Sequence, residues 1–161
     1  MAKPRIAAPT PRPVDDEEAK LGKVLAFMQH LWAVSHGLHS MSKRMEATLG
    51  ITGPQRLVLR VVGRNPRISA GWLADTLRLH PSTLTGVLRR LEKRRLLGRI
   101  TDPDDGRRAL LALTDDGKKL DALQAHTTEA AVRRAMRRLS DGDLAAAARV
   151  LHVVISELER G

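Results

Sequence analysis

Hydrophobic residues recur at steps of three and four along most of the chain, which is the spacing of amphipathic α-helices. The first such pattern starts at an acidic stretch, residues 15–18, whose charges suit the N-terminal end of a helix dipole. It continues to about Leu49 and predicts one long helix over residues 15–49 with a single apolar stripe. A helix of this length and pattern is typical of one that packs against a partner subunit.

Three shorter helices are predicted next, over residues 52–63, 69–77 and 81–94. Thr52 opens the first with a capping-box pattern, and Pro81 stands in the first turn of the third, where proline is well tolerated. The third helix has an apolar face that should point into the core, made of Leu84, Val87, Leu88 and Leu91.

Two short apolar segments, residues 96–101 and 109–113, flank the sequence Asp-Pro-Asp-Asp-Gly at 102–106. Proline, aspartate and glycine in this order form turns, so the pair is predicted to be a β-hairpin. Thr114 then caps a second long helix, which we expect to run without a break to about Met136. The residues Ser140-Asp141-Gly142-Asp143 break and recap the chain, and a final amphipathic helix follows them.

Short helices followed by a hairpin, with long helices on both sides, have the element order of a winged helix-turn-helix. The predicted fold class is mainly α with a small β-hairpin wing. Residues 50–114 would form the winged helix-turn-helix DNA-binding lobe, and residues 15–49 and 115–161 the long helices of a dimerisation region. Residues 1–14 hold four prolines among small and basic residues and are predicted to be a flexible N-terminal arm.

Positive charge is concentrated in the predicted lobe. The chain carries 28 Lys and Arg against 18 Asp and Glu, a formal net charge of +10. Between Arg56 and Arg108, thirteen basic residues stand against five acidic ones, a local surplus of about +8. Arginines that merely solvate every exposed face would be spread evenly. The concentration therefore favours a polyanionic partner, with nucleic acid first.

The helix predicted at 81–94 presents small and basic side chains on the face opposite its apolar residues. Hydroxyls near the start of a helix allow close approach to base edges, and cations behind them can reach phosphates or guanine. The candidate DNA-binding residues on this helix are Ser82, Thr83, Thr85, Arg89, Arg90 and Lys93. Gly86 lies among them and contributes no side chain of its own.

Several classes of function are excluded by what the sequence lacks. Without cysteine there is no thiolate nucleophile, disulfide framework or thiol redox switch. No Gly-rich phosphate loop, Gly-x-Ser-x-Gly elbow or His-Glu-x-x-His motif occurs, so we expect no enzyme and no cofactor. No signal-peptide pattern or membrane-spanning apolar run is found, which predicts a cytoplasmic protein without membrane contact.

A set of short motifs occurs together between residues 49 and 120. They are Gly50-Ile51-Thr52 with Pro54-Gln55, Leu73-Ala74-Asp75, Pro81-Ser82-Thr83-Leu84-Thr85, Arg90-Leu91-Glu92, Leu96-Leu97, and Asp102-Pro103-Asp104-Asp105-Gly106-Arg107-Arg108 followed by Leu113-Thr114. In this combination the chain resembles the MarR family of bacterial transcription regulators. The flanking helices match the family in pattern only.

The resemblance implies a homodimer whose two winged lobes bind a pseudo-palindromic operator in double-stranded DNA. The recognition helix at 81–94 would lie in the major groove, and the wing at 97–113 would reach the minor groove. At the wing tip Arg107 would enter the groove, with Asp105 holding its guanidinium and Arg108 beside it. Repression is the commoner outcome in the family and is the one expected here.

The resemblance also implies a crevice for a small aromatic or anionic effector between the dimer core and the DNA-binding lobe. The candidate effector-binding residues are Met28, Trp32, His36, His39 and Arg60. An alternative interpretation makes them ordinary core and interface residues. His36 and His39 also have the spacing of a metal pair, but they lack further ligands, so no metal site is assigned.

Two other DNA- or protein-binding roles fit the same basic lobe. A low-specificity nucleoid-type DNA-binding protein would use the same face, so measured sequence specificity must separate it from a regulator. A winged helix used for protein contacts is also left open, because Gly86 replaces a long polar side chain found there in many relatives.

Overall fold

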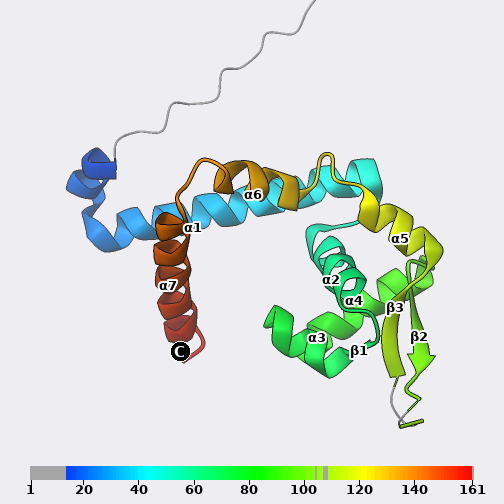
Figure 1. Ribbon diagram of the computed structural model, residues 1–161. Coiled ribbons are helices and arrows are strands. Elements are labelled where there is room, and N and C mark those ends of the chain that lie inside the picture. Colours follow the sequence, from blue (N-terminus) through cyan, green and yellow to red (C-terminus); the bar gives the residue numbers. More distant parts are fainter. Residues whose placement is uncertain (1–13, 104, 107–108, 161) are drawn as a thin grey trace, which may run out of the picture. The chain divides into compact units, whose positions relative to one another are not determined.

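The computed structural model describes residues 14–103, 105–106 and 109–160, with side chains from residue 20 onward. Its internal contacts divide the chain into two units, residues 1–39 and 40–161. The described part of the chain forms the following elements in order (Figure 1): α1 (Val14–Leu49), α2 (Gly53–Arg64), β1 (Ile68–Ser69), α3 (Ala70–Leu77), α4 (Pro81–Lys93), β2 (Leu97–Thr101), β3 (Ala109–Leu113), α5 (Asp115–Ala122), α6 (Thr128–Met136) and α7 (Asp141–Leu158).

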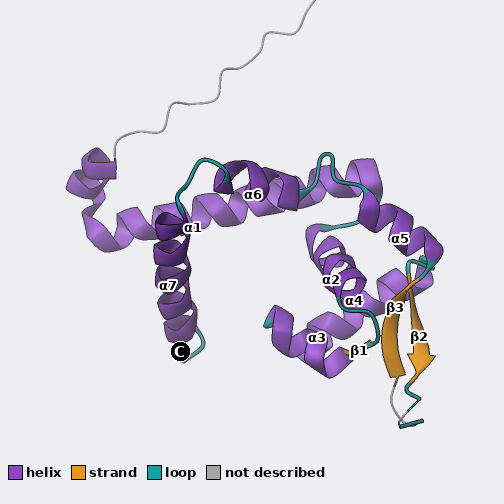
Figure 2. Ribbon diagram, viewed as in Figure 1, coloured by secondary structure: helices purple, strands orange, loops and turns teal. Residues whose placement is uncertain are grey.

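The predicted fold class is confirmed: the protein is mainly helical, with one small antiparallel sheet (Figure 2). β2 and β3 pair as the expected hairpin, with Leu97 opposite Leu113. β1 adds a third strand on the other side of β3, where Ile68 pairs with Leu111. Sequence reasoning missed this strand because two residues are too few to show an alternating pattern.

The core of the lobe lies between α2, α3, α4 and the sheet. α4 places its predicted apolar face inward, and Leu84, Val87, Leu88 and Leu91 are all buried. The other buried members of this cluster are Ile51, Val58, Leu59, Val62, Leu73, Ala74, Leu96, Leu97 and Leu111. Burial of this apolar surface fixes α4 with its opposite face outward.

The helix ends follow the predicted capping residues. The Thr52 amide donates to Gln55 Oε1 at 3.0 Å, and the Gly117 amide donates to Thr114 Oγ1 at 3.1 Å. At the start of α7 the Ser140 hydroxyl donates to Asp143 Oδ2 at 2.7 Å. That hydrogen bond, together with one from the Ser140 amide, lowers the pKa of the Asp143 carboxyl.

The first long helix was predicted to be continuous, and this is wrong. α1 begins at Val14, the last residue of the expected N-terminal arm, and Gly22 interrupts it with φ +73° and ψ 158°. The rest of that arm lies outside the described residues. Glycine has no Cβ and enters this left-handed region without steric cost, so a helix-spaced pattern can continue across the break.

The prediction of one unbroken helix from Thr114 to Met136 is wrong. α5 ends at Ala122, Leu123 is extended with ψ 128°, and His126 has φ +60°. A new cap then starts α6, where the Ala130 amide donates to Thr127 Oγ1 at 3.3 Å. The apolar spacing spans this link, which is why the sequence pattern did not reveal it.

Among the described residues, none of the helices has the length and apolar character required to cross a membrane.

Candidate nucleic-acid interface

The outer face of α4 carries the six candidate residues predicted for that helix. Ser82, Thr83, Thr85, Arg89, Arg90 and Lys93 are all exposed. They lie opposite the buried leucine and valine positions of the same helix. Gly86 stands between them with no atom within 4 Å of where a Cβ would lie, so the middle of this face is open.

The N-terminus of α4 is held by side chains next to the candidate residues. His80 is the N-cap, and its Nδ1 accepts a hydrogen bond from the Ser82 amide at 3.3 Å. The same ring nitrogen is 2.7 Å from Ser82 Oγ. Thr85 Oγ1 donates to the Pro81 carbonyl at 2.8 Å. Two of the three hydroxyls are therefore oriented before any partner binds.

The cations of α4 differ from the arginines around them. Arg89, Arg90 and Lys93 have no acidic partner within 4 Å in the described part of the chain. Arg99, by contrast, contacts Glu92 at 2.6 Å. Arg94 hydrogen-bonds the Gly50 carbonyl. Among the described residues, the charges of these three side chains are thus not paired with an acid and can attract an anion.

Two arginines counted in the basic surplus do not belong to this surface. Arg56 is 2% exposed and Arg60 half-buried, and both turn from α2 toward α5 and α6. Arg56 Nε contacts Glu129 at 2.7 Å, and Arg60 Nη1 contacts Asp121 at 3.0 Å. Counting all thirteen basic residues as surface charge therefore overstates the interface.

Arg56 is a structural residue that sequence reasoning missed. Its guanidinium also donates to the carbonyls of Leu120, Asp121 and Leu123, at 2.6, 3.2 and 2.6 Å. These carbonyls lie at the C-terminal end of α5, where a helix leaves acceptors without partners. The available signal was its spacing, because Arg56 stands three residues before the buried Leu59 on one face of α2.

The wing is described up to its tip. β2 and β3 carry the hairpin, and Asp105 is exposed in the turn between them. Arg107 and Arg108, the two basic residues predicted for the tip, lie outside the described residues.

The candidate effector residues fall in two different units. Met28, Trp32, His36 and His39 follow one another at helical spacing on α1, with Met28 half-buried and Trp32 64% exposed. Arg60 belongs to the other unit, where it contacts Asp121 and, at 3.7 Å, Glu129. Within the described residues, no three His, Cys, Asp or Glu side chains are grouped so as to hold a metal ion.

Comparison with known proteins places this lobe. Residues 49–108 match the MarR family model. The chain is 32% identical over 104 residues to the organic hydroperoxide resistance transcriptional regulator of Bacillus subtilis. The matched region covers 65% of this chain and 69% of that protein. Two further curated relatives are matched over only about half of their lengths, 48% and 53%.

Solved structures share the fold. The S. aureus MepR–DNA complex superposes with a TM-score of 0.69 at 21% identity, covering 81% of this chain and 97% of that one. The PcaV transcriptional regulator of Streptomyces coelicolor, solved with its natural ligand, gives 0.63 at 25% identity, covering 81% and 90%.

The fold and the exposed basic helix define a winged-helix protein of the transcription-regulator class. More particularly, the chain belongs to the MarR family.

Proposed function

We propose that the protein is a homodimeric, sequence-specific transcriptional repressor that binds a pseudo-palindromic operator. The recognition helix, α4, would lie in the major groove and the wing, residues 97–113, in the minor groove of each half-site. The observation that carries the proposal is the outer face of α4, where hydroxyls and uncompensated cations stand over a packed apolar core.

Each part of that face has a distinct task. Ser82, Thr83 and Thr85 are small enough to let the helix N-terminus approach base edges closely. The C-terminal half of α4 carries Arg89, Arg90 and Lys93. These side chains are long enough to contact phosphates or guanine. Because Ser82 and Thr85 are already hydrogen-bonded within the chain, binding does not have to order these two side chains.

In the wing, Arg107 would insert into the minor groove, with Asp105 orienting its guanidinium and Arg108 contacting the backbone. A narrow minor groove has a strong negative potential that attracts arginine. The pairing of β2 with β3 supports this role, because it forms the hairpin from which a wing is built.

The dimer is proposed from apolar surface that has no partner within the chain. In the described residues α6 and α7 contain no buried side chain. α7 nevertheless exposes large apolar groups: Val150, Leu151, Val153, Ile155 and Leu158 are 37% to 74% exposed. Large apolar side chains exposed at helical spacing are typical of an interaction site, and a second copy of the chain is its proposed occupant.

Regulation by a small aromatic or anionic effector is proposed at Met28, Trp32, His36, His39 and Arg60. The proposal is supported by the PcaV transcriptional regulator, a protein of similar fold whose structure was solved in complex with its natural ligand. If titration with a panel of aromatic acids changes neither Trp32 fluorescence nor DNA affinity, this assignment is wrong.

The test of DNA binding replaces Arg89 and Arg90 together with glutamine. We expect affinity to fall about tenfold or more for a duplex that the protein enriches from a random library, because one good arginine–base contact contributes roughly 1–3 kcal/mol. The measurement is a fluorescence-anisotropy titration at several salt concentrations. Arg149→Gln, which removes one positive charge at an exposed position of α7, is the control.

The proposal fails if the double variant binds like the Arg149→Gln control. If the unaltered protein binds the enriched duplex and a scrambled one equally, the low-specificity nucleoid-type alternative is correct instead. A specific regulator should prefer the enriched duplex by about 10³-fold or more.

A further inference from the structure

The first hydroxyl of α4 has a fixed role as donor or acceptor, which is set by the residue before the helix. His80 Nδ1 accepts the Ser82 amide hydrogen at 3.3 Å, and a backbone N–H can only donate. This ring nitrogen therefore carries no hydrogen of its own when it caps the helix. The Ser82 hydroxyl lies 2.7 Å from the same nitrogen and so donates to it. The Ser82 oxygen keeps its lone pairs but has no hydrogen left for another partner.

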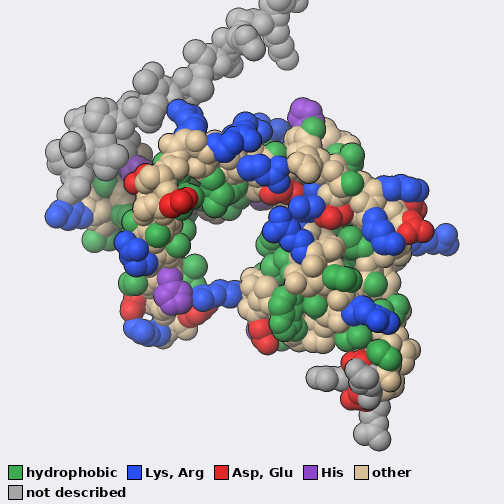
Figure 3. Space-filling view, in the orientation of Figure 1, with side chains coloured by type: hydrophobic (Ala, Val, Ile, Leu, Met, Phe, Trp, Pro, Cys, Tyr) green, Lys and Arg blue, Asp and Glu red, His purple; other side chains and the backbone are tan. Residues whose placement is uncertain are grey.

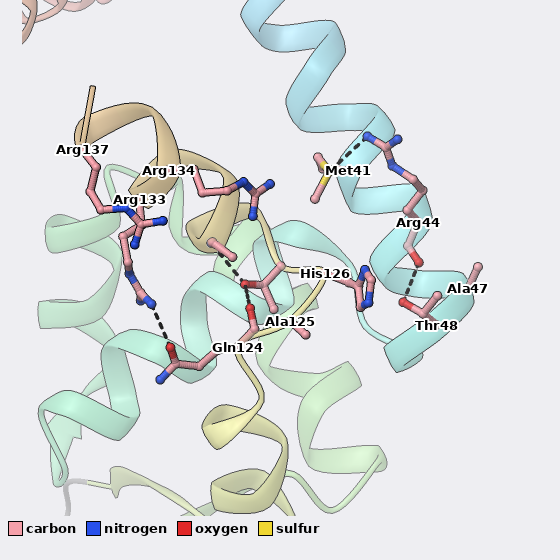
Figure 4. A pocket seen from close by; sticks show the side chains of 12 residues that line it. Met41, Arg44, Ala47, Thr48, Gln124, Ala125, His126, Arg133, Arg134 and Arg137 are labelled. Carbon is pink, nitrogen blue, oxygen red and sulfur yellow. Dashed lines mark hydrogen bonds between the residues drawn. The ribbon is translucent and has the colours of Figure 1, made fainter. Parts of the chain in front are cut away.

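Thr85 is held in the same state by a different hydrogen bond. Its Oγ1 donates to the Pro81 carbonyl at 2.8 Å, one helical turn earlier. Thr48 of α1 makes the equivalent hydrogen bond to the Arg44 carbonyl at 2.9 Å, drawn as a dashed line in Figure 4. Threonine in a helix commonly bonds to this carbonyl. Thr85 therefore also offers its oxygen to a partner only as an acceptor.

The two acceptors share one face of α4 with an open position and a donor. Helical spacing of three, four and seven residues places on this face Ser82, Thr85, Gly86 and Arg89. A Cβ at Gly86 would meet no atom within 4 Å, so the helix backbone can come close to a partner here. Close approach is what short hydroxyl side chains need to reach the edges of bases. The guanidinium of Arg89 carries only donors.

Positive charge alone does not decide which base pairs such a face prefers. Cations attract the phosphates of any sequence, and basic side chains also gather over α6 on the face shown in Figure 3. In the major groove, adenine N6 and cytosine N4 are amino donors, whereas guanine O6 and thymine O4 are keto acceptors. A hydroxyl that can only accept forms a hydrogen bond with the amino group and none with the keto oxygen.

We propose that Ser82 and Thr85 select base pairs that turn an amino group toward α4, and that His80 is the positioning residue that keeps Ser82 an acceptor. This selectivity rests on the proposed function, because it requires α4 to lie in the major groove. Without the His80 ring, the Ser82 hydroxyl would be free to rotate and donate to a keto oxygen. Asparagine at this position keeps an acceptor at the N-cap and should preserve the selectivity.

The test starts from the duplex that the full chain enriches from a random library. Selection is repeated with Ser82→Ala and with Thr85→Val, and the base preference that each variant loses marks the position contacted by that side chain. Unsubstituted purine then replaces adenine at that position, or pyrimidinone replaces cytosine, which removes the amino group alone. Fluorescence anisotropy measures the affinities at a mildly alkaline pH, where imidazoles are ordinarily neutral.

Removal of the amino group should weaken binding by the unaltered protein about threefold to tenfold, the value of one neutral hydrogen bond. The variant that lacks the matching hydroxyl should lose less than about twofold. Thr48→Val removes the equivalent threonine hydrogen bond from an exposed position of α1 and should respond like the unaltered protein.

The role of His80 is tested by exchanging the amino group for a keto oxygen at the position that Ser82 contacts, A·T to G·C or C·G to T·A. We expect the unaltered protein and His80→Asn to lose affinity about tenfold. His80→Ala should lose less than about twofold, because its Ser82 hydroxyl turns to donate. If the His80 ring only stabilised the helix, His80→Ala would weaken binding to both duplexes in the same proportion and leave their ratio unchanged.

Four results would overturn the inference while an enriched duplex still supports the proposed function. They are no base preference lost in either hydroxyl variant, no loss of affinity when the amino group is removed, an unchanged ratio in His80→Ala, and a ratio in His80→Asn that matches His80→Ala. Failure of the library to yield any enriched duplex would instead refute the proposed function, and the inference with it.

Discussion

Arg56 connects three elements through a single side chain. From α2 it satisfies carbonyl oxygens at the end of α5 and a carboxylate in the first turn of α6. A buried guanidinium is costly to desolvate, and here its hydrogen bonds compensate that cost. The same hydrogen bonds provide donors for the carbonyl oxygens that have no partner where α5 ends. The break in the helix and the buried arginine therefore stabilise each other.

Replacing Arg56 with methionine keeps the aliphatic volume but removes those donors. We expect the free energy of unfolding to fall by about 3 kcal/mol, because partly buried carbonyls and Glu129 lose hydrogen bonds from a buried guanidinium. Arg64→Met, an exposed position on the same helix, should change it by less than about 0.5 kcal/mol. Urea denaturation measures both. Equal stability of the two variants would show that Arg56 has no such role.

The packing around the glycines of α4 and α5 differs. In α4, a Cβ at Gly86 would meet nothing within 4 Å. In α5, a Cβ at Gly117 would lie 1.9 Å from the Leu96 carbonyl oxygen. Gly117 is therefore required for the close approach of α5 to the chain before β2, whereas Gly86 is not required by packing.

Gly86→Ala should stabilise the protein by roughly 0.5–1 kcal/mol, because alanine loses less backbone entropy in a helix. Gly117→Ala should destabilise it, since α5 must shift to clear the carbonyl oxygen. Thermal denaturation of the two variants gives the comparison. A stabilised Gly117→Ala or a clearly destabilised Gly86→Ala would contradict the packing described for these helices.

Local sequence signals predicted the elements that local interactions determine. The caps at Thr52, Thr114 and Ser140 join residues only three apart. The apolar positions of α4 recur at helical spacing within that helix. Both features could therefore be predicted from the sequence. The break after α5 could not, because the apolar spacing continues across it and the hydrogen bond that Leu123 accepts there comes from Arg56, 67 residues away in sequence. β1 likewise exists only through pairing with β3.

The candidate site also has a part that the sequence predicts and a part that depends on contacts between elements. The outward residues of α4 follow from helical spacing once its core face is known. Which arginines take part does not follow from spacing. Among the described residues Arg89 and Arg90 have no acidic partner, whereas Arg56 and Arg99 have one through contacts between elements. The wing arginines and the effector residues stay predictions.

At the scale of the whole molecule, two features point to paired copies. α7 exposes an apolar face that nothing in the described chain buries, and one α4 can read only one half-site. Two-fold symmetry in the protein would impose two-fold symmetry on its DNA, with half-sites about 10 base pairs apart. If the proposed repressor is a symmetric dimer, its operator should have the same two-fold symmetry.

The most direct measurement is selection of bound duplexes from a random library by the full chain, followed by sequencing. A symmetric dimer with one α4 in each half-site predicts an enriched inverted repeat whose halves are separated by about one helical turn. Enrichment of a single unrepeated element, or no enrichment over the starting library, would contradict it.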